Sequence, residues 1–354
     1  MAMAERQRAA FLAAGADAAE IVSGPPDGLS FGERLGAAIR ALGGEGGAIV
    51  MGSGSIPLAR PADLRRFVEV AAGPAGRAVA NNFYSADVVA VSRAADLADL
   101  PPLPADNAVP RWLKERAGVA VRDLRARWRL GVDVDTPLDL IVIGAAGGAA
   151  GGVAPFGAAG GTPFGASAGV AGHGTAPLIG ERLAALSEIL SNRRAELLVA
   201  GRISSTTLRW LESGVACRVR ALVEERGLRA ATRLAQSGPT TELRPPRSVL
   251  GELLDRDGPE SLAATVGRLA DAALIDTRVL LAHRHGAEER AWPPAEDRFA
   301  SDLLMAESIG DPWLRALTES AATSPADRPI LLGGHTLVNG GLRLLAQRAR
   351  AGRP

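Results

Sequence analysis

The sequence predicts an α/β protein built from two three-layer domains. Amphipathic segments with helical periodicity alternate along the chain with short apolar runs that are typical of buried strands. The 354 residues are enough to form two hydrophobic cores. A stretch at residues 144–177, rich in Gly and Ala, separates two series of such elements. We therefore expect domains at residues 1–143 and 178–354, joined by a flexible linker.

The first half begins with helices. Helix formers with alternating charges predict a helix at residues 6–14, and Leu35, Ile39 and Leu42 form the apolar side of another at residues 31–42. Pro61 suits the first turn of a helix that runs to residue 72. The other expected elements are strands or extended segments at 19–22, 46–52, 79–91, 140–143 and from 129 to Asp135, and a helix at 109–117.

The second half repeats the alternation. We expect helices at 181–190, 204–211, 261–272, 312–322 and 337–350, and strands at 196–200, 217–223, 273–282 and 329–332. Two strand ends are followed by residues suited to anion binding, Gly333-Gly334 and Arg202 with Ser204. Hydroxyls at these positions can equally cap helices. Any ligand crevice of this half is expected at the carboxyl ends of its strands.

Composition limits the partners and the location. The formal net charge of +1 provides no field for binding nucleic acid or an anionic membrane. Cys217 is the single cysteine, so an intrachain disulfide is excluded and a cytoplasmic location is the default. Residues 140–172 carry no charge and are long enough to cross a bilayer, but their Gly and Ala content argues against a membrane span. Self-association is left open.

The most informative run is residues 129–143, which contains Asp133 and Asp135. A spacing of two on a strand directs both carboxylates to one face, where they can hold a divalent cation. Thr136 and Pro137 then suit the cap and first turn of a helix. The same acids can instead serve only to cap that turn, and this alternative remains open.

Small and polar residues near other strand ends predict a phosphate or nucleotide site. Small residues after a strand let the backbone approach a phosphate, and serines add hydroxyl groups. The candidate nucleotide-binding residues are Ser53, Gly54, Ser55, Asn81, Asn82, Asp106 and Asn107.

With these motifs, residues 20–143 resemble the nucleotidyltransferases of the glycosyltransferase-A fold, especially the molybdenum-cofactor and 2-phospho-L-lactate guanylyltransferases. The resemblance rests on the run at residues 133–139 and, more weakly, on the Ile56-Pro57-Leu58 turn. It implies a Rossmann-like mixed sheet and Mg²⁺ bound by Asp135, with Asp133 and Thr136 beside it. It also implies transfer of a nucleoside monophosphate from a nucleoside triphosphate to a small phosphorylated acceptor.

The chain departs from this family at two points. The family's Gly-rich nucleotide loop is missing, since residues 5–8 favour a helix where the family has a strand. Ser53-Gly54-Ser55 stands where the family places a metal-binding Asp. The alternative function is therefore a non-catalytic protein that binds a nucleotide or phosphometabolite. In the enzyme, Arg111 or Lys114 would balance phosphate charge.

A second candidate site lies in the second half. His283 and His285 share a face if a strand extends that far, and His335 or Asp302 could complete a transition-metal site suited to hydrolysis. A solvated strand end explains the same residues.

Overall fold

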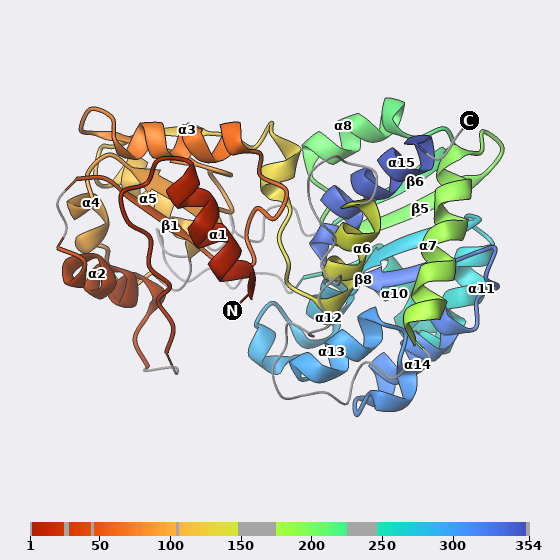
Figure 1. The fold of residues 1–354 in the computed structure, drawn as a ribbon. Coiled ribbons are helices and arrows are strands. Elements are labelled where there is room, and N and C mark those ends of the chain that lie inside the picture. Colours follow the sequence, from red (N-terminus) through yellow and green to blue (C-terminus); the bar gives the residue numbers. More distant parts are fainter. Residues whose placement is uncertain are drawn as a thin grey trace. The chain divides into compact units, whose positions relative to one another are not determined.

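The computed structural model describes residues 2–24, 28–43, 46–103, 106–147, 175–224 and 246–351. They form an α/β protein with one mixed and one parallel β-sheet (Figure 1). The chain divides into two compact units, Met1–Asp133 and Val134–Pro354. This division comes earlier than the boundary expected at residue 143. Residues 148–174 of the expected linker lie outside the described residues.

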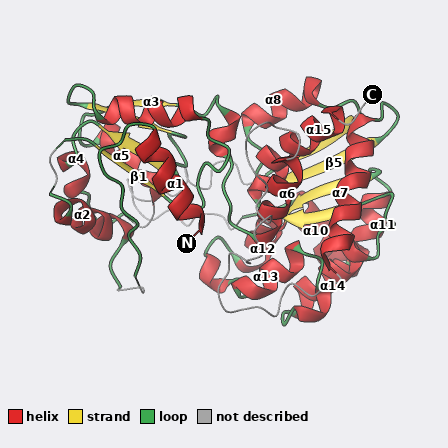
Figure 2. Ribbon diagram, in the orientation of Figure 1, coloured by secondary structure: helices red, strands yellow, loops and turns green. Residues whose placement is uncertain are grey.

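The first unit contains the mixed sheet, whose strands are drawn in yellow in Figure 2. Its strand order is β1-β3-β2-β4, with β3 antiparallel to both β1 and β2 and β2 parallel to β4. The central strand β3 is buried along its whole length, as expected for a strand covered on both faces. The strands are β1 (Ala48–Met51), β2 (Arg77–Ala80), β3 (Val88–Val91) and β4 (Ala120–Asp123).

Helices pack on both faces of this sheet. Ala78 contributes to an apolar cluster with Leu97 and Leu113, whereas the adjacent Val79 packs in another with Phe11 and Phe67. This split follows from the alternation of side chains along a strand. The helices are α1 (Ala2–Ala13), α2 (Phe31–Ala41), α3 (Pro61–Ala71), α4 (Ala95–Ala98) and α5 (Val109–Glu115), with 3-10 turns η1 (Asp106–Ala108) and η2 (Trp128–Gly131).

The second unit is built on the parallel sheet, in the order β6-β5-β7-β8. Strands β6 and β7 lie on opposite sides of β5, so the order in which successive strands are added to the sheet reverses at β5. In open α/β sheets, ligands bind beside the carboxyl ends of the strands at such a switch point. The strands are β5 (Glu196–Gly201), β6 (Arg218–Val223), β7 (Ala272–Asp276) and β8 (Ile330–Gly333).

Helices surround this sheet and contact one another. Helix α15 contacts α6, α7 and α8, while α14 contacts α11 and α13, and α10 contacts α12. The helices are α6 (Pro137–Gly147), α7 (Thr175–Ser191), α8 (Ser205–Gly214), α10 (Val249–Asp257), α11 (Leu262–Gly267), α12 (Thr277–His285), α13 (Ala295–Asp302), α14 (Pro312–Ala322) and α15 (Leu342–Ala351). Shorter turns are η3 (Pro259–Ser261), η4 (Glu289–Ala291), η5 (Ala306–Ser308) and the π-helical η6 (Leu337–Gly341).

A buried cation joins α7 to the end of α14. The Arg182 side chain is almost completely buried, and its guanidinium donates to the Ser324 hydroxyl (2.7 Å) and the Ala322 carbonyl (2.7 Å). These acceptors belong to the carboxyl end of α14, which attracts positive charge. Burial lowers the pKa of Arg182.

Four strand predictions are wrong. Residues 19–22 form no regular element, and residues 140–143 belong to α6. The predicted strand at 273–282 ends at Asp276 and continues as α12, because the Asp276 side chain caps that helix. The expected strand before Asp135 is reduced to one isolated bridge, Ser55 to Asp133. The helices at 31–42, 61–72 and 312–322 are confirmed to within a residue or two.

In the part of the chain that the structure describes, no helix has the length and apolar character needed to cross a membrane. Residues 148–172 of the uncharged stretch fall outside that part.

Candidate metal site

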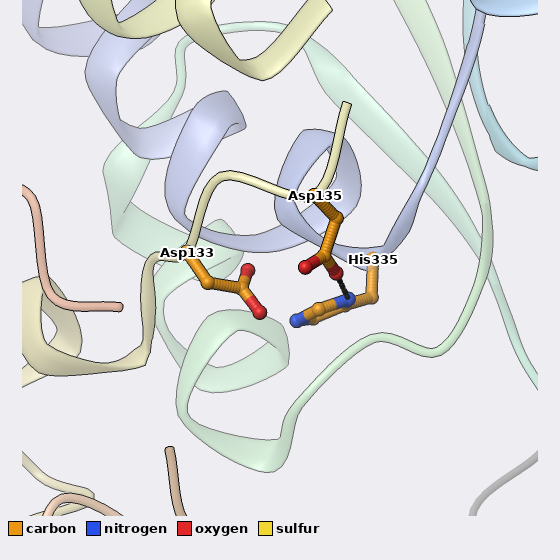
Figure 3. Close-up of side chains that lie close together, drawn as sticks. All are labelled: Asp133, Asp135 and His335. Carbon is orange, nitrogen blue, oxygen red and sulfur yellow. Dashed lines mark ion pairs between the residues drawn. The ribbon is translucent and has the colours of Figure 1, made fainter. Parts of the chain in front are cut away.

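Asp133, Asp135 and His335 form a group with the geometry of a metal site (Figure 3). Each residue offers one ligand atom, and these atoms all lie within 4.8 Å of one another. His335 Nδ1 lies 3.8 Å from Asp135 Oδ2, and the two form an ion pair when the imidazole is protonated. Asp133 and Asp135 are two residues apart along the chain, and His335 follows β8.

The backbone before Asp133 is held by the turn at residues 53–56. Ser55 forms the isolated antiparallel bridge with Asp133, and Ile56 N donates to Val132 O (3.1 Å). Ile56 has φ 45°, a left-handed conformation that is strained for a β-branched residue. Both contacts fix the course of the chain into the Asp133 position.

The backbone at Asp135 is held by a reciprocal cap on α6. Asp139 Oδ2 accepts from the backbone N of Asp135 (3.1 Å) and of Thr136 (2.9 Å). Thr136 Oγ1 in turn accepts from Asp139 N (3.3 Å). Capping is thus performed by Thr136 and Asp139. The carboxylate of Asp135 lies with His335 instead, and 60% of that side chain is exposed.

His335 follows β8 and is held through its backbone. Asn339, in the π-helical turn η6, donates from Nδ2 to His335 O (2.7 Å) and to Arg202 O (2.9 Å). Its Oδ1 accepts from Ser204 N (2.7 Å). Asn339 therefore joins the segments that follow β5 and β8. Single π-turns in helical regions are common at functional sites.

Two ion pairs with buried carboxylates lie near the carboxyl ends of β5 and β7. Arg202 binds Asp276 through Nε (2.6 Å) and Nη2 (3.0 Å), and Arg278 binds Asp302 at 2.5 and 2.7 Å. The first pair needs Gly201, which has φ 129°, because a Cβ there would overlap the Asp276 side chain. Asp302, expected beside the histidines of the second metal site, pairs with Arg278 instead. No local pattern predicts either ion pair, since the partners are 74 and 24 residues apart along the chain.

The charged groups near the carboxyl ends of β5, β7 and β8 shift one another's pKa values. Burial opposes the ionised form of Asp276, but the charge and hydrogen bonds of Arg202, with smaller help from His335, lower the pKa of that carboxyl. Burial also opposes the charge on Arg202, yet Asp276, and more weakly Asp135, raise its pKa. Burial raises the pKa of Asp302, against the opposing charge of Arg278. The ion pairs and the Asp135–His335 pair therefore share one electrostatic environment.

The predicted nucleotide-binding residues organise loops of the first unit. Asn81 is 1% exposed and donates to Asp87 Oδ2 (2.9 Å) and Leu130 O (2.8 Å), while its Oδ1 accepts from the Asp87 and Val88 backbone. Ser55 Oγ donates to Asp87 O (3.3 Å). The structure thus joins Ser55 and Asn81 through Asp87, and the hydrogen-bonding groups of Asn81 are used within the unit.

The other predicted residues of this set lie in turns. Ser53 and Gly54 form the turn before Ser55, and Asp106 begins η1. Asn82 Oδ1 accepts from Tyr84 N (3.0 Å), and Asn107 Oδ1 accepts from Ser85 Oγ (2.9 Å).

The histidines proposed as a second metal site separate. His283 lies on a helix, where Nδ1 accepts from Ser248 N (3.0 Å) and Nε2 lies 3.1 Å from Asp255 Oδ2. Both ring nitrogens thus join α10 to α12. Residues Thr277–His285 form helix α12 and not the strand that was expected to carry His283 and His285 on one face. His335 groups with Asp133 and Asp135 instead.

No protein-family model, curated protein or solved structure matches the chain.

Proposed function

We propose that the protein is a nucleotidyltransferase that requires a divalent metal. It would transfer a nucleoside monophosphate from a nucleoside triphosphate to a small phosphorylated acceptor, and its first unit would have a glycosyltransferase-A-like fold. The observation that carries this proposal is the Asp133, Asp135 and His335 group, whose ligand atoms all lie within 4.8 Å of one another. The mixed sheet of the first unit is compatible with the proposed fold.

The three side chains of the group differ in their exposure to solvent. Asp135 is 60% exposed and His335 33%, so a phosphate from solvent can reach the position that these two residues define. Asp133 is less exposed and is held by its bridge to Ser55. A bound divalent ion would supply charge neutralisation for a triphosphate. Arg111 and Lys114, on α5, remain the proposed partners for further phosphate charge.

The second candidate function is binding of the same ligands without turnover. One observation favours it: Ser55 stands where the resembling enzymes carry an acid, and its side chain is 3% exposed and directed to Asp87 O. Without an acid at position 55, the proposed metal ligands are limited to the Asp133, Asp135 and His335 group. Such a site can bind a metal–nucleotide complex without orienting it for attack by an acceptor.

The test combines nucleotide binding with pyrophosphate release. Thermal unfolding is measured against a panel of nucleoside triphosphates with Mg²⁺, Mn²⁺ or a chelator, and a ligand at ~100 times its Kd should add about 2.7 kcal/mol of stability. Pyrophosphate release is then measured with phosphorylated acceptors. The variants are Asp135→Asn and the control Asp257→Asn, an exposed residue at the end of α10.

We expect a metal-dependent shift and pyrophosphate release in the wild type and in Asp257→Asn, with both lost in Asp135→Asn. A shift without release from any acceptor would favour the non-catalytic alternative. Neither a shift nor release with any triphosphate would contradict both functions.

A further inference from the structure

We infer that the Asp133, Asp135 and His335 group selects a divalent transition ion, such as Zn²⁺, Co²⁺ or Mn²⁺, over Mg²⁺. The inference deepens the proposed function, on whose metal site it rests, and it differs from the Mg²⁺ that the sequence resemblance implies. It names the class of ion that these side chains fit and makes His335 a ligand.

The donor atoms favour this class. Mg²⁺ takes oxygen ligands in near-octahedral geometry and retains several waters. An imidazole nitrogen is a better donor for Zn²⁺ and its transition-metal neighbours, and affinity generally rises from Mn²⁺ towards Zn²⁺. One nitrogen and two carboxylates also match the three protein ligands and one open position of many catalytic zinc sites.

The separation of the donors fits an ion better than a direct contact. His335 Nδ1 and Asp135 Oδ2 are 3.8 Å apart, which is too far for a hydrogen bond. Two ligands of a tetrahedral Zn²⁺ are about 3.4 Å apart, because each bond is about 2.1 Å long. The separation of His335 Nδ1 and Asp135 Oδ2 exceeds that spacing by a few tenths of an ångström. The donor atoms of the whole group lie within 4.8 Å of one another.

Rigid elements present both ligands. The backbone of Asp135 donates to the Asp139 side chain at the start of α6. His335 is held by Asn339 at its carbonyl, and two residues earlier Gly333 O accepts from Thr277 Oγ1 (3.2 Å). A Cβ at Gly333 would lie 2.9 Å from the Leu337 side chain, so this approach to His335 is closely packed. The backbone that carries the imidazole is thus held in place, which a preorganised ligand site needs.

Calorimetric titration of the metal-free full-length chain tests the inference without any nucleotide. Mg²⁺, Mn²⁺, Co²⁺ and Zn²⁺ are titrated into the wild type, His335→Asn and Asp135→Asn. His285→Asn is the matched control, because it makes the same change in a histidine at the end of α12. Thermal unfolding without metal checks that each variant is folded.

In the wild type, affinity should increase from Mg²⁺ through Mn²⁺ and Co²⁺ to Zn²⁺. His335→Asn should weaken Zn²⁺ binding by about tenfold or more and leave Mg²⁺ binding unchanged, since only the transition ions gain from the imidazole. Asp135→Asn should weaken all four ions, and His285→Asn none. Equal wild-type affinities for Mg²⁺ and Zn²⁺, or unchanged Zn²⁺ binding in His335→Asn, would overturn the inference.

The visible spectrum of the Co²⁺-loaded wild type is a second test that needs no variant. Coordination by fewer than six ligands, including a nitrogen, gives intense bands, and we expect these. The weak spectrum of hexa-aquo Co²⁺ would overturn the inference. Zn²⁺ binding through His335 without pyrophosphate release would reject nucleotidyl transfer alone. Transfer with equal Mg²⁺ and Zn²⁺ binding would reject the metal preference alone.

Discussion

Asp139 caps helix α6 by accepting the backbone N–H of Asp135 at 3.1 Å. The carboxylate of Asp135 lies instead beside His335, 3.8 Å from its Nδ1. Two acids four residues apart thus have different tasks, one in the helix start and the other in the candidate metal site. The cap at the start of α6 is formed by Thr136 and Asp139.

The two acids should therefore respond differently to substitution. Asp139→Ala removes the acceptor for two backbone N–H groups and should cost about 0.5–2 kcal/mol of unfolding free energy. Asp135→Ala should cost less than Asp139→Ala in the metal-free protein, because 60% of the Asp135 side chain is exposed and exposed ion pairs contribute about 0–1 kcal/mol. Urea unfolding in chelator measures both. Equal losses would show that Asp135 has a structural role that the cap does not explain.

Gly201 should not tolerate a side chain. Gly201→Ala places a methyl group against Asp276 at φ 129°, so it should destabilise the protein by more than about 1 kcal/mol and disturb the Arg202–Asp276 pair. Gly180→Ala is the control, because Gly180 lies in α7 with open space at its Cβ. The control should gain up to about 1 kcal/mol. Thermal unfolding distinguishes them, and a harmless Gly201→Ala would contradict the described packing.

Removing one partner of the Arg278–Asp302 pair should be costly. Asp302→Asn leaves a buried guanidinium without its counter-charge and should cost about 3–5 kcal/mol. Replacing both residues, as Arg278→Met with Asp302→Leu, should recover most of that loss, because no charge then remains buried. A double-mutant cycle by urea unfolding measures the coupling. Independent, additive effects would argue against the pair.

Cys217 should be unreactive in the folded protein. Burial raises the pKa of its thiol from 9.0 to about 11, so little thiolate is present at pH 8. Alkylation by iodoacetamide at pH 8 should be slow in buffer and fast in urea. The linkage has a definite sign: above pH 9 the unfolded chain loses a proton that the folded chain retains, so stability falls as pH rises from 9 to 11. Cys217→Ala should lack this component, and fast native alkylation would contradict the burial.

Local patterns were enough to predict much of the fold. The α/β class is confirmed, and so are strands β5, β6 and β8 within two residues, because their apolar runs are short and bounded by turn residues. The start of α6 followed from Thr136 and Pro137. Residues 140–143 and 277–282 were mistaken for strands, since a short apolar run looks the same in a buried helix.

The candidate site could be predicted only in part. The spacing of Asp133 and Asp135 indicated a cation, and both residues lie in the group. From the sequence alone, His335 was grouped with His283 and His285, because no local sequence pattern places the segment after β8 beside the start of α6. That proximity depends on the packing of α6 with η6 and α15. The Arg202–Asp276 and Arg278–Asp302 pairs likewise depend on strand order and helix packing.

Crystals of the protein soaked in ZnCl₂ and measured at the zinc edge test the central claim most directly. An anomalous peak about 2.0–2.2 Å from one donor atom each of Asp133, Asp135 and His335 is the predicted result. The peak should disappear in Asp135→Asn and persist in Asp257→Asn. Zinc bound only at other residues, or no peak at a Zn²⁺ concentration that saturates the protein in solution, would contradict the account.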